Sequence, residues 1–433
     1  MPIVAKEDGW ELPTALWERT RASQRFDPVR GVIPSGVVTV GAFSSTSQTY
    51  TNLATILWNS GQFNTQGQRW QGVDSTPSNG CRNVATPRTS GGTPINHVTA
   101  FEFLHTGGNL DIMMVGGAYY DCQVYVEYFG KMHKATAAPV TGSTTGVVYL
   151  PLTFAAAFHG RVRVHLGGAT LIGIRTEQSS IVKKSPDRPF AILDGPKWAD
   201  AAGLKQSSGT SYLTAGVADL YFERTGIVTA PRGMPSGFFY NGSATVTDDT
   251  AAADGSTRFF SASRKAILEQ DFQEKPLFYI LLGTLDDGGR SGANGASNGP
   301  MATRADDCYA WIRSKDTRVF IFHVSPPPFN GGGAAGTVTG PPTADSSNDF
   351  NRREQASAIA DVENAAYLNL FGPTAPAFTG AGSLGSPTTS QQAMLIGADG
   401  QNPDINGNRW LAGYLAVESG KQIVDTLRAR RIR

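Results

Sequence analysis

The sequence has little charge and few cysteines. Charged residues make up 17% of its 433 positions, against about a quarter in average proteins, and the formal net charge is +1. A near-neutral chain lacks the electrostatic footprint of a dedicated nucleic-acid binder. Cys81, Cys122 and Cys308 are an odd number without a C-x-x-C pair. They disfavour a disulfide framework and a metal site, so we expect no metal and no cofactor, and we expect Cys122 to be a buried apolar residue.

Long apolar runs are also missing. No run approaches the roughly 18 residues that a membrane span requires, and no early cationic-then-apolar stretch resembles a signal peptide. We therefore expect no membrane insertion, no signal-driven secretion, and synthesis in the cytoplasm. The basic end, Arg428 to Arg433, is interpreted as the solvated end of a terminal helix rather than a phosphate contact.

Glycine, with 50 residues, and proline, with 25, are abundant, which favours many turns and short strands. A hydrophobic fraction of 40% is too high for a disordered chain, and the length allows two or three domains. Residues 1–35 mix charges with Trp10 and Trp17 and show no strand alternation. We interpret them as an N-terminal arm.

Residues 36–182 show the period-two alternation of half-buried antiparallel strands. Val162, Val164 and Leu166 alternate with polar residues, and the segment 122–128 repeats the pattern. Such strands follow one another at short spacing, and no helical stretch lies between them. The pattern predicts an antiparallel β-sandwich of jelly-roll type.

Residues 183–433 predict a second, α/β domain. It begins with a proline-bearing linker at 183–189 and contains continuous apolar runs at 190–193, 277–282 and 319–324, which are typical of parallel strands buried on both faces. Helix-like stretches follow these runs at 261–271, 304–314, 352–370 and 407–431. Strand alternating with helix is the α/β signature.

Short motifs at the edges of these elements carry a resemblance to a known family. They are GPK at 195–197, GTLD at 283–286 and DGQNP at 399–403. In order and position they resemble the Gly-Asp-Ser, Gly-x-Asn-Asp and Asp-x-x-His-Pro motifs of the SGNH (GDSL-type) hydrolases. The resemblance covers roughly residues 188–427. It implies a flavodoxin-like sheet and the ancestry of a serine esterase.

The chain departs from this family at the residues that do the chemistry. By the resemblance, Lys197 stands at the nucleophilic serine, Asn402 at the histidine and Leu285 at the oxyanion asparagine, while Asp399 is retained. Acyl transfer needs a nucleophile, an imidazole base and oxyanion donors. We therefore expect no catalytic residue and interpret the domain as a pseudoenzyme, although a serine in a shifted register would restore an enzyme.

Other candidate chemistry is weaker. A nucleophilic Lys197 would need a lowered pKa, which Asp194 and Asp200 oppose if they lie near it. His323 ends an apolar run and is interpreted as a structural histidine. The sandwich offers aromatic residues that could stack on a sugar, and the candidate glycan contacts are Trp70, Tyr119 and Tyr120.

Two functional hypotheses follow. The first is a non-catalytic structural or adhesive protein, such as a tail, fibre or decoration subunit of a phage virion. The order of the two domains supports it, because it resembles the order in some bacterial and phage SGNH esterases, in which a jelly-roll module precedes the catalytic domain. Its partners would be other virion subunits, further copies of itself and a host-surface glycan. The alternative is an active carbohydrate esterase or deacetylase that acts on surface polysaccharide.

Overall fold

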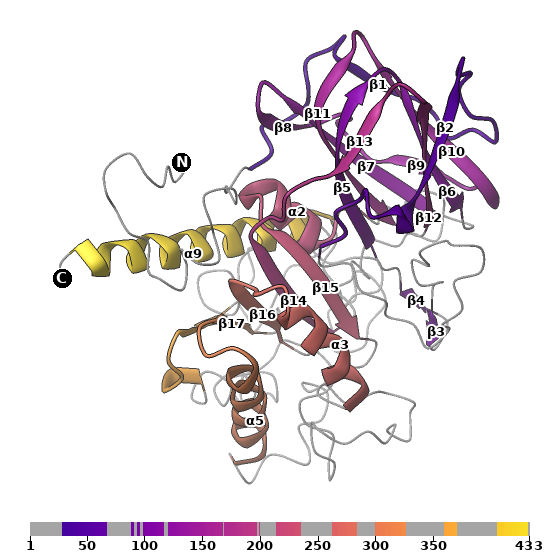
Figure 1. Cartoon of the computed structure of the whole chain (residues 1–433). Coiled ribbons are helices and arrows are strands. Elements are labelled where there is room, and N and C mark those ends of the chain that lie inside the picture. The colour runs from indigo at the N-terminus through magenta and orange to yellow at the C-terminus, as the bar shows by residue number, and fades with distance from the viewer. Residues whose placement is uncertain are drawn as a thin grey trace.

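The computed structural model describes parts of both predicted regions. The described residues are 28–66, 88–90, 93–95, 98–116, 120–167, 169–196, 199, 214–234, 262–283, 299–325, 359–369 and 405–431. Figure 1 shows a β-rich part built from the first half of the chain and a second part in which helices surround a sheet.

The β-rich part consists of two antiparallel sheets. One has the order β1-β10-β6-β12-β2, and the other has the order β13-β5-β11-β7-β8, with β9 also paired to β7. Strands β3 (Arg88–Ser90) and β4 (Thr93–Ile95) form a separate two-stranded sheet. The strands of the two larger sheets are β1 (Val38–Val40), β2 (Leu53–Leu57), β5 (Val98–Gly107), β6 (Leu110–Gly116), β7 (Tyr120–Tyr128), β8 (Lys131–Lys134), β9 (Val140–Gly142), β10 (Gly146–Phe154), β11 (Phe158–Gly167), β12 (Thr170–Glu177) and β13 (Ile181–Lys184).

One apolar core joins the two sheets, so this part is a β-sandwich. The core takes Val162 and Val164 from one sheet and Ile112 and Leu150 from the other. The predicted alternation is therefore confirmed, because every second side chain of a strand faces the partner sheet. Cys122 is fully buried in this core, as predicted. The jelly-roll connectivity stays a prediction.

The predicted arm and linker both lie against the interface between the two parts. The arm is described from residue 28, where Val29 donates its N–H to the Glu223 carbonyl and Arg30 donates to the Met132 carbonyl. The predicted linker is less open than its composition indicates. Its first two residues belong to β13, and Ser185 and Arg188 are buried.

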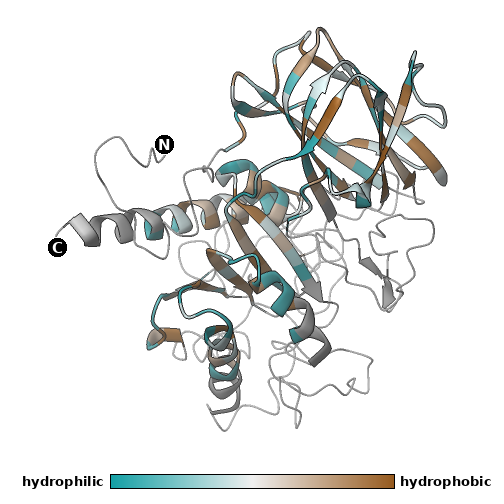
Figure 2. Cartoon of the chain, viewed as in Figure 1, coloured by the Kyte–Doolittle hydropathy of each residue, from teal (hydrophilic) through white to brown (hydrophobic). Residues whose placement is uncertain are grey.

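The second part is built on a parallel sheet. Its strands are β14 (Phe190–Pro196), β15 (Val228–Met234), β16 (Phe278–Leu282), β17 (Phe320–Val324) and β18 (Ala365–Leu368). They lie in the order β15-β14-β16-β17-β18, and every neighbouring pair is parallel. Numbered along the chain this is 2-1-3-4-5, the flavodoxin-like order. The three predicted apolar runs are β14, β16 and β17, and Figure 2 shows the central strands in hydrophobic colours.

Helices cover both faces of this sheet. On one face α2 (Val217–Thr225) packs beside α9 (Ile405–Arg431), with Tyr221 of α2 bonded to Ser419 of α9 (Figure 1). On the other face lie α3 (Ala262–Phe272) and α5 (Gly299–Lys315). The prediction of a helix over 352–370 is corrected at its end, where Ala365–Leu368 form β18. Within the described ranges, no helix combines the length and the apolar character needed to cross a membrane.

Candidate functional site

The strand order points to one edge of the parallel sheet. β14 has β15 on one side and β16 on the other, so the connections reverse direction beside β14. In open α/β sheets, ligands bind outside the carboxyl ends of the strands at such a switch point. The residues that follow β14 and β16 therefore define the candidate functional site.

The four family-equivalent positions lie outside the described residues. They are Lys197, Leu285, Asp399 and Asn402. Two described strands lead to two of these positions. β14 ends one residue before Lys197, and β16 ends three residues before Leu285. β14 and β16 are neighbours in the sheet. The chain therefore approaches both positions from the switch point.

The backbone is tightly packed where β14 approaches the site. A Cβ on Gly195 would lie 2.6 Å from the Cβ of Leu282 on β16, so the close approach of these strands requires glycine. The preceding residue, Asp194, is fully buried and accepts a 2.5 Å hydrogen bond from the Tyr279 hydroxyl. This contact ties the Asp194 carboxyl to the neighbouring strand β16.

Further polar residues share the sheet face covered by α3 and α5. Arg232 of β15 pairs with Asp271 of α3 through two 2.7 Å hydrogen bonds. On β17, His323 is fully buried and its Nδ1 contacts the Tyr309 hydroxyl of α5. Burial lowers the pKa of His323 to about 3, so its ring is neutral at physiological pH. The prediction of a structural histidine is confirmed by these contacts.

The other described histidines belong to the sandwich. His105 lies on β5, His133 on β8, and His159 and His165 on β11. His97 falls outside the described residues. A general base must reach the proton that it removes. Within the described part of the chain, no solvent-accessible imidazole lies at the carboxyl edge of the parallel sheet.

One histidine contacts a carboxylate in the manner of a catalytic pair. His165 Nδ1 lies 2.5 Å from Asp219 Oδ1, across the boundary between β11 and α2. Its other ring nitrogen, Nε2, accepts a 2.8 Å hydrogen bond from Arg163 Nε. Because Nε2 is already occupied, this imidazole cannot take a proton from a nucleophile. His165 was missed from the sequence as an interface residue, because a polar residue on an alternating strand indicates only a solvent-facing position.

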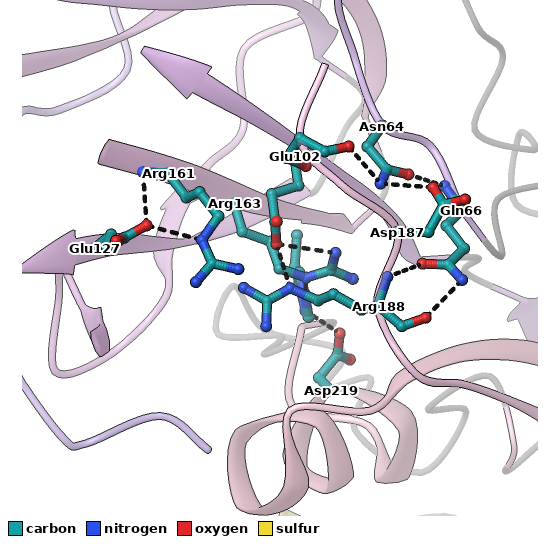
Figure 3. Close-up of polar contacts among 11 residues, drawn as sticks. Asn64, Gln66, Glu102, Glu127, Arg161, Arg163, Asp187, Arg188 and Asp219 are labelled. Atoms are coloured by element: carbon teal, nitrogen blue, oxygen red, sulfur yellow. Dashed lines mark hydrogen bonds and ion pairs between the residues drawn. The ribbon is translucent and has the colours of Figure 1, made fainter. Parts of the chain in front are cut away.

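Through their contacts with each other and with Asp219, Arg163 and His165 belong to a buried polar network that joins the two parts. Figure 3 shows Arg163 beside Glu102 and Arg188 in this network. Glu102 accepts a 2.7 Å bond from Arg188 Nε and lies 3.7 Å from Arg163 Nη1. Burial opposes ionisation of Glu102, but the charges of Arg188 and Arg163 outweigh it and hold the pKa of this carboxyl below its ordinary value. Gln66 exchanges hydrogen bonds with the Arg188 backbone and so fixes the linker.

The predicted glycan contacts are not brought together at a described surface. Trp70 and Tyr119 lie outside the described residues. Tyr120 is only 2% exposed, and its ring packs on Phe43 with centroids 4.7 Å apart. This position is corrected to the sandwich core, because a buried ring offers no face to a sugar. No group of three or more His, Cys, Asp or Glu side chains in the described ranges is arranged to hold a metal ion.

No protein-family model and no curated protein sequence matches the chain. Similar solved structures include several carbohydrate esterases and a GDSL-like lipase. A family two carbohydrate esterase from Clostridium thermocellum in complex with cellohexaose has 13% identity and a TM-score of 0.49, covering 76% of this chain and 93% of that one. A family 2 carbohydrate esterase with a carbohydrate-binding domain from Corynascus thermopiles has 14% identity and a TM-score of 0.47, covering 80% and 98%. A GDSL-like lipase from Bacteroides ovatus has 12% identity and a TM-score of 0.44, covering 75% and 84%. At these identities the likeness concerns the fold and not the activity.

Proposed function

We propose that this chain is a non-catalytic structural or adhesive protein that uses a dismantled hydrolase scaffold. The observation that carries the proposal is the placement of the histidines. His165 is occupied by Arg163 and Asp219, and His323 is fully buried beside Tyr309. An acyl-transfer site of the resembled type needs an accessible imidazole beside its nucleophile.

The sequence adds two reasons that concern the loops. Lys197 and Asn402 stand where the resembled family has serine and histidine. An amide does not accept a proton near neutral pH, and a lysine kept charged is not a nucleophile. Loss of nucleophile and base together leaves only the residual rate that binding and remaining donors supply.

We further propose that the protein acts in an assembly. A phage virion is the proposed setting, with other subunits, further copies of this chain and a host-surface glycan as partners. This assignment rests on the family resemblance and on the low charge of the chain. Few charged residues are typical of surfaces that pack against other proteins. Sedimentation of the full chain and proteomics of purified particles test it. A monomer at high concentration that is absent from particles would contradict it.

A second candidate function is supported by the switch point. The tight approach of Gly195 to Leu282 keeps the backbone geometry of a ligand-binding strand end. An active carbohydrate esterase or deacetylase acting on surface polysaccharide would use this edge, with a serine in a shifted register as nucleophile.

One assay separates the two functions. Hydrolysis of p-nitrophenyl acetate and of an acetylated polysaccharide is measured with and without a serine-directed fluorophosphonate. The non-catalytic protein shows no turnover above a heat-denatured control and no labelled serine. An esterase shows turnover that the fluorophosphonate abolishes, and Asp399→Asn lowers it strongly while Asp361→Asn, at an exposed position, leaves it unchanged. Labelling of a single serine therefore overturns the first proposal.

A further inference from the structure

The interface between the sandwich and the α/β part is organised around α2. Besides His165–Asp219, Glu223 of α2 accepts a 2.9 Å bond from the Tyr125 hydroxyl and pairs with Lys134 at 2.7 Å. Asp121 of β7 accepts 2.9 Å bonds from both the backbone N–H and the hydroxyl of Thr214, just before α2. All these contacts run from the six-stranded sheet to α2 or its approach. Together with the linker, α2 thus attaches the two parts.

Arg163 is held in one position within this attachment. Glu102 lies 3.7 Å from its Nη1, and the Phe222 ring of α2 stacks on its guanidinium at 4.4 Å. The Arg163 side chain is about 5% exposed. These contacts aim Nε–H at His165 Nε2, 2.8 Å away.

An arginine donor at Nε2 determines where the imidazole carries its proton. Guanidinium is donor-only, so Nε2 must be the unprotonated, accepting nitrogen. Nδ1 must then carry the hydrogen, which it donates to Asp219. A second proton on Nε2 would set two N–H groups against each other beside a like charge. A cavity of about 10 Å³ next to His165 holds at most one water, which leaves little room for relaxation.

We propose that Arg163 is a positioning residue that locks His165 as the neutral Nδ1–H tautomer and so keeps α2 docked on the sandwich across the pH range in which free histidine titrates. Arg163 acts through His165 and touches no ligand. The proposal is independent of whether the protein is an enzyme.

The surrounding charges fit this role. The pKa of His165 lies well below its usual range because of burial first, and then because of Arg163, Lys134 and Arg188. Arg163 is the first of these charges and therefore adds to burial in disfavouring the imidazolium. The titratable and charged groups around the ring are Glu102 of β5, Asp121 and Tyr125 of β7, Lys134 of β8, Arg163 of β11, Arg188 of the linker, and Asp219 and Glu223 of α2.

The test is nuclear magnetic resonance of the full chain with labelled histidine. In the wild type, the His165 ring shows protonated Nδ1 and unprotonated Nε2 and does not titrate between pH 5 and 8. His159, exposed on the same strand, is the internal reference for a solvent-accessible ring. Amide exchange of α2, corrected for the chemical rate, stays constant over this range.

Three variants separate the role of Arg163 from that of burial. Arg163→Met frees Nε2 and removes one of the charges that lower the pKa of His165, so His165 begins to titrate above pH 5, and α2 exchange becomes pH-dependent by about tenfold or more. Asp219→Asn retains Arg163 and leaves His165 non-titrating. Arg161→Gln, two residues away on β11, changes neither readout. A wild-type His165 that titrates or carries Nε2–H overturns the proposal. An Arg163→Met variant in which His165 still does not titrate also overturns the proposal, because burial alone would then explain the tautomer. If this variant does not fold, the wild-type and Asp219→Asn spectra decide.

Discussion

The two sheets of the sandwich have similar inner faces and very different outer faces. Outward residues of the six-stranded sheet, such as Glu102, Arg163 and His165, are almost completely buried. On the five-stranded sheet the outward residues Leu53, Thr55 and Leu57 of the edge strand β2 are exposed, while outward Asp111 and Met113 of β6 and Tyr149 of β10 are buried. The difference arises because α2 and the linker cover the first face. On the six-stranded sheet, the buried polar residues therefore lie at the interface to the second part.

The largest loss of stability is expected at the buried charges on the outer face of the six-stranded sheet. Glu102→Gln leaves the guanidinium groups of Arg163 and Arg188 buried without their carboxylate. We expect a loss of about 3–5 kcal/mol in the free energy of unfolding, because an uncompensated buried charge is costly. Urea unfolding of both proteins at pH 7 measures it. Since the pKa of Glu102 is lowered in the folded state, its contribution is present above the unfolded pKa and is lost in acid. A loss below about 1 kcal/mol would show that this face resembles a solvated one.

A smaller loss is expected at the contact between β7 and α2. Tyr125→Phe removes the hydroxyl that donates to Glu223, while Lys134 still pairs with that carboxylate. Hydrogen bonds to charged groups contribute about 1.5–3 kcal/mol, so we expect a loss in that range. Amide exchange of α2 should rise accordingly, while exchange of the sandwich core stays constant. Equal acceleration in both places would contradict a local attachment through α2.

The exposed face should respond weakly to a comparable change. Arg175 stacks on the Tyr149 ring at 4.7 Å on the five-stranded sheet, as Arg163 stacks on Phe222 at the interface. Arg175→Met removes this cation–π contact and a 3.1 Å hydrogen bond from Nη1 to the Ser47 hydroxyl, at a partly solvated position. We expect a loss of about 0.5–1 kcal/mol in urea unfolding. A loss as large as that of Glu102→Gln would remove the distinction between the two faces.

The smallest effect is expected at the rim of the interface. Arg161 pairs with Glu127 at 2.8 Å, and both side chains are about one-fifth exposed. Arg161→Gln should change the free energy of unfolding by about 0.5 kcal/mol, since water screens such pairs. Adding 0.5 M salt should reduce the difference from wild type further. A salt-independent loss above about 2 kcal/mol would place Arg161 within the buried network.

The sequence predicts the central strands of the parallel sheet correctly. Continuous apolar runs identify β14, β16 and β17, because strands buried on both faces carry no polar alternation. It fails at the edges of the parallel sheet. β15 contains Pro231, which disfavours a central strand but is tolerated at an edge. β18 is built of Ala365, Ala366, Tyr367 and Leu368, mostly helix formers, and pairing with β17 overrides that propensity.

Of the candidate site, the sequence predicts only the strands that lead to it. Local motifs locate Gly195 and Gly283 after apolar runs, and the structure puts β14 and β16 side by side. The buried contacts beneath the edge could not be predicted. Asp194 meets Tyr279 across 85 positions, and His165 meets Asp219 across 54. No local pattern encodes such partners.

By itself, the sequence determined that two kinds of sheet exist and which side chains of each strand share a face, because side-chain periodicity follows from backbone geometry. Only the tertiary structure decided what covers each face. Alternation assigns Arg161, Arg163 and His165 equally to the outward side of β11, yet α2 buries the last two and leaves the first at the rim. The reason is that covering a face depends on packing between segments distant in the chain, which periodicity does not record.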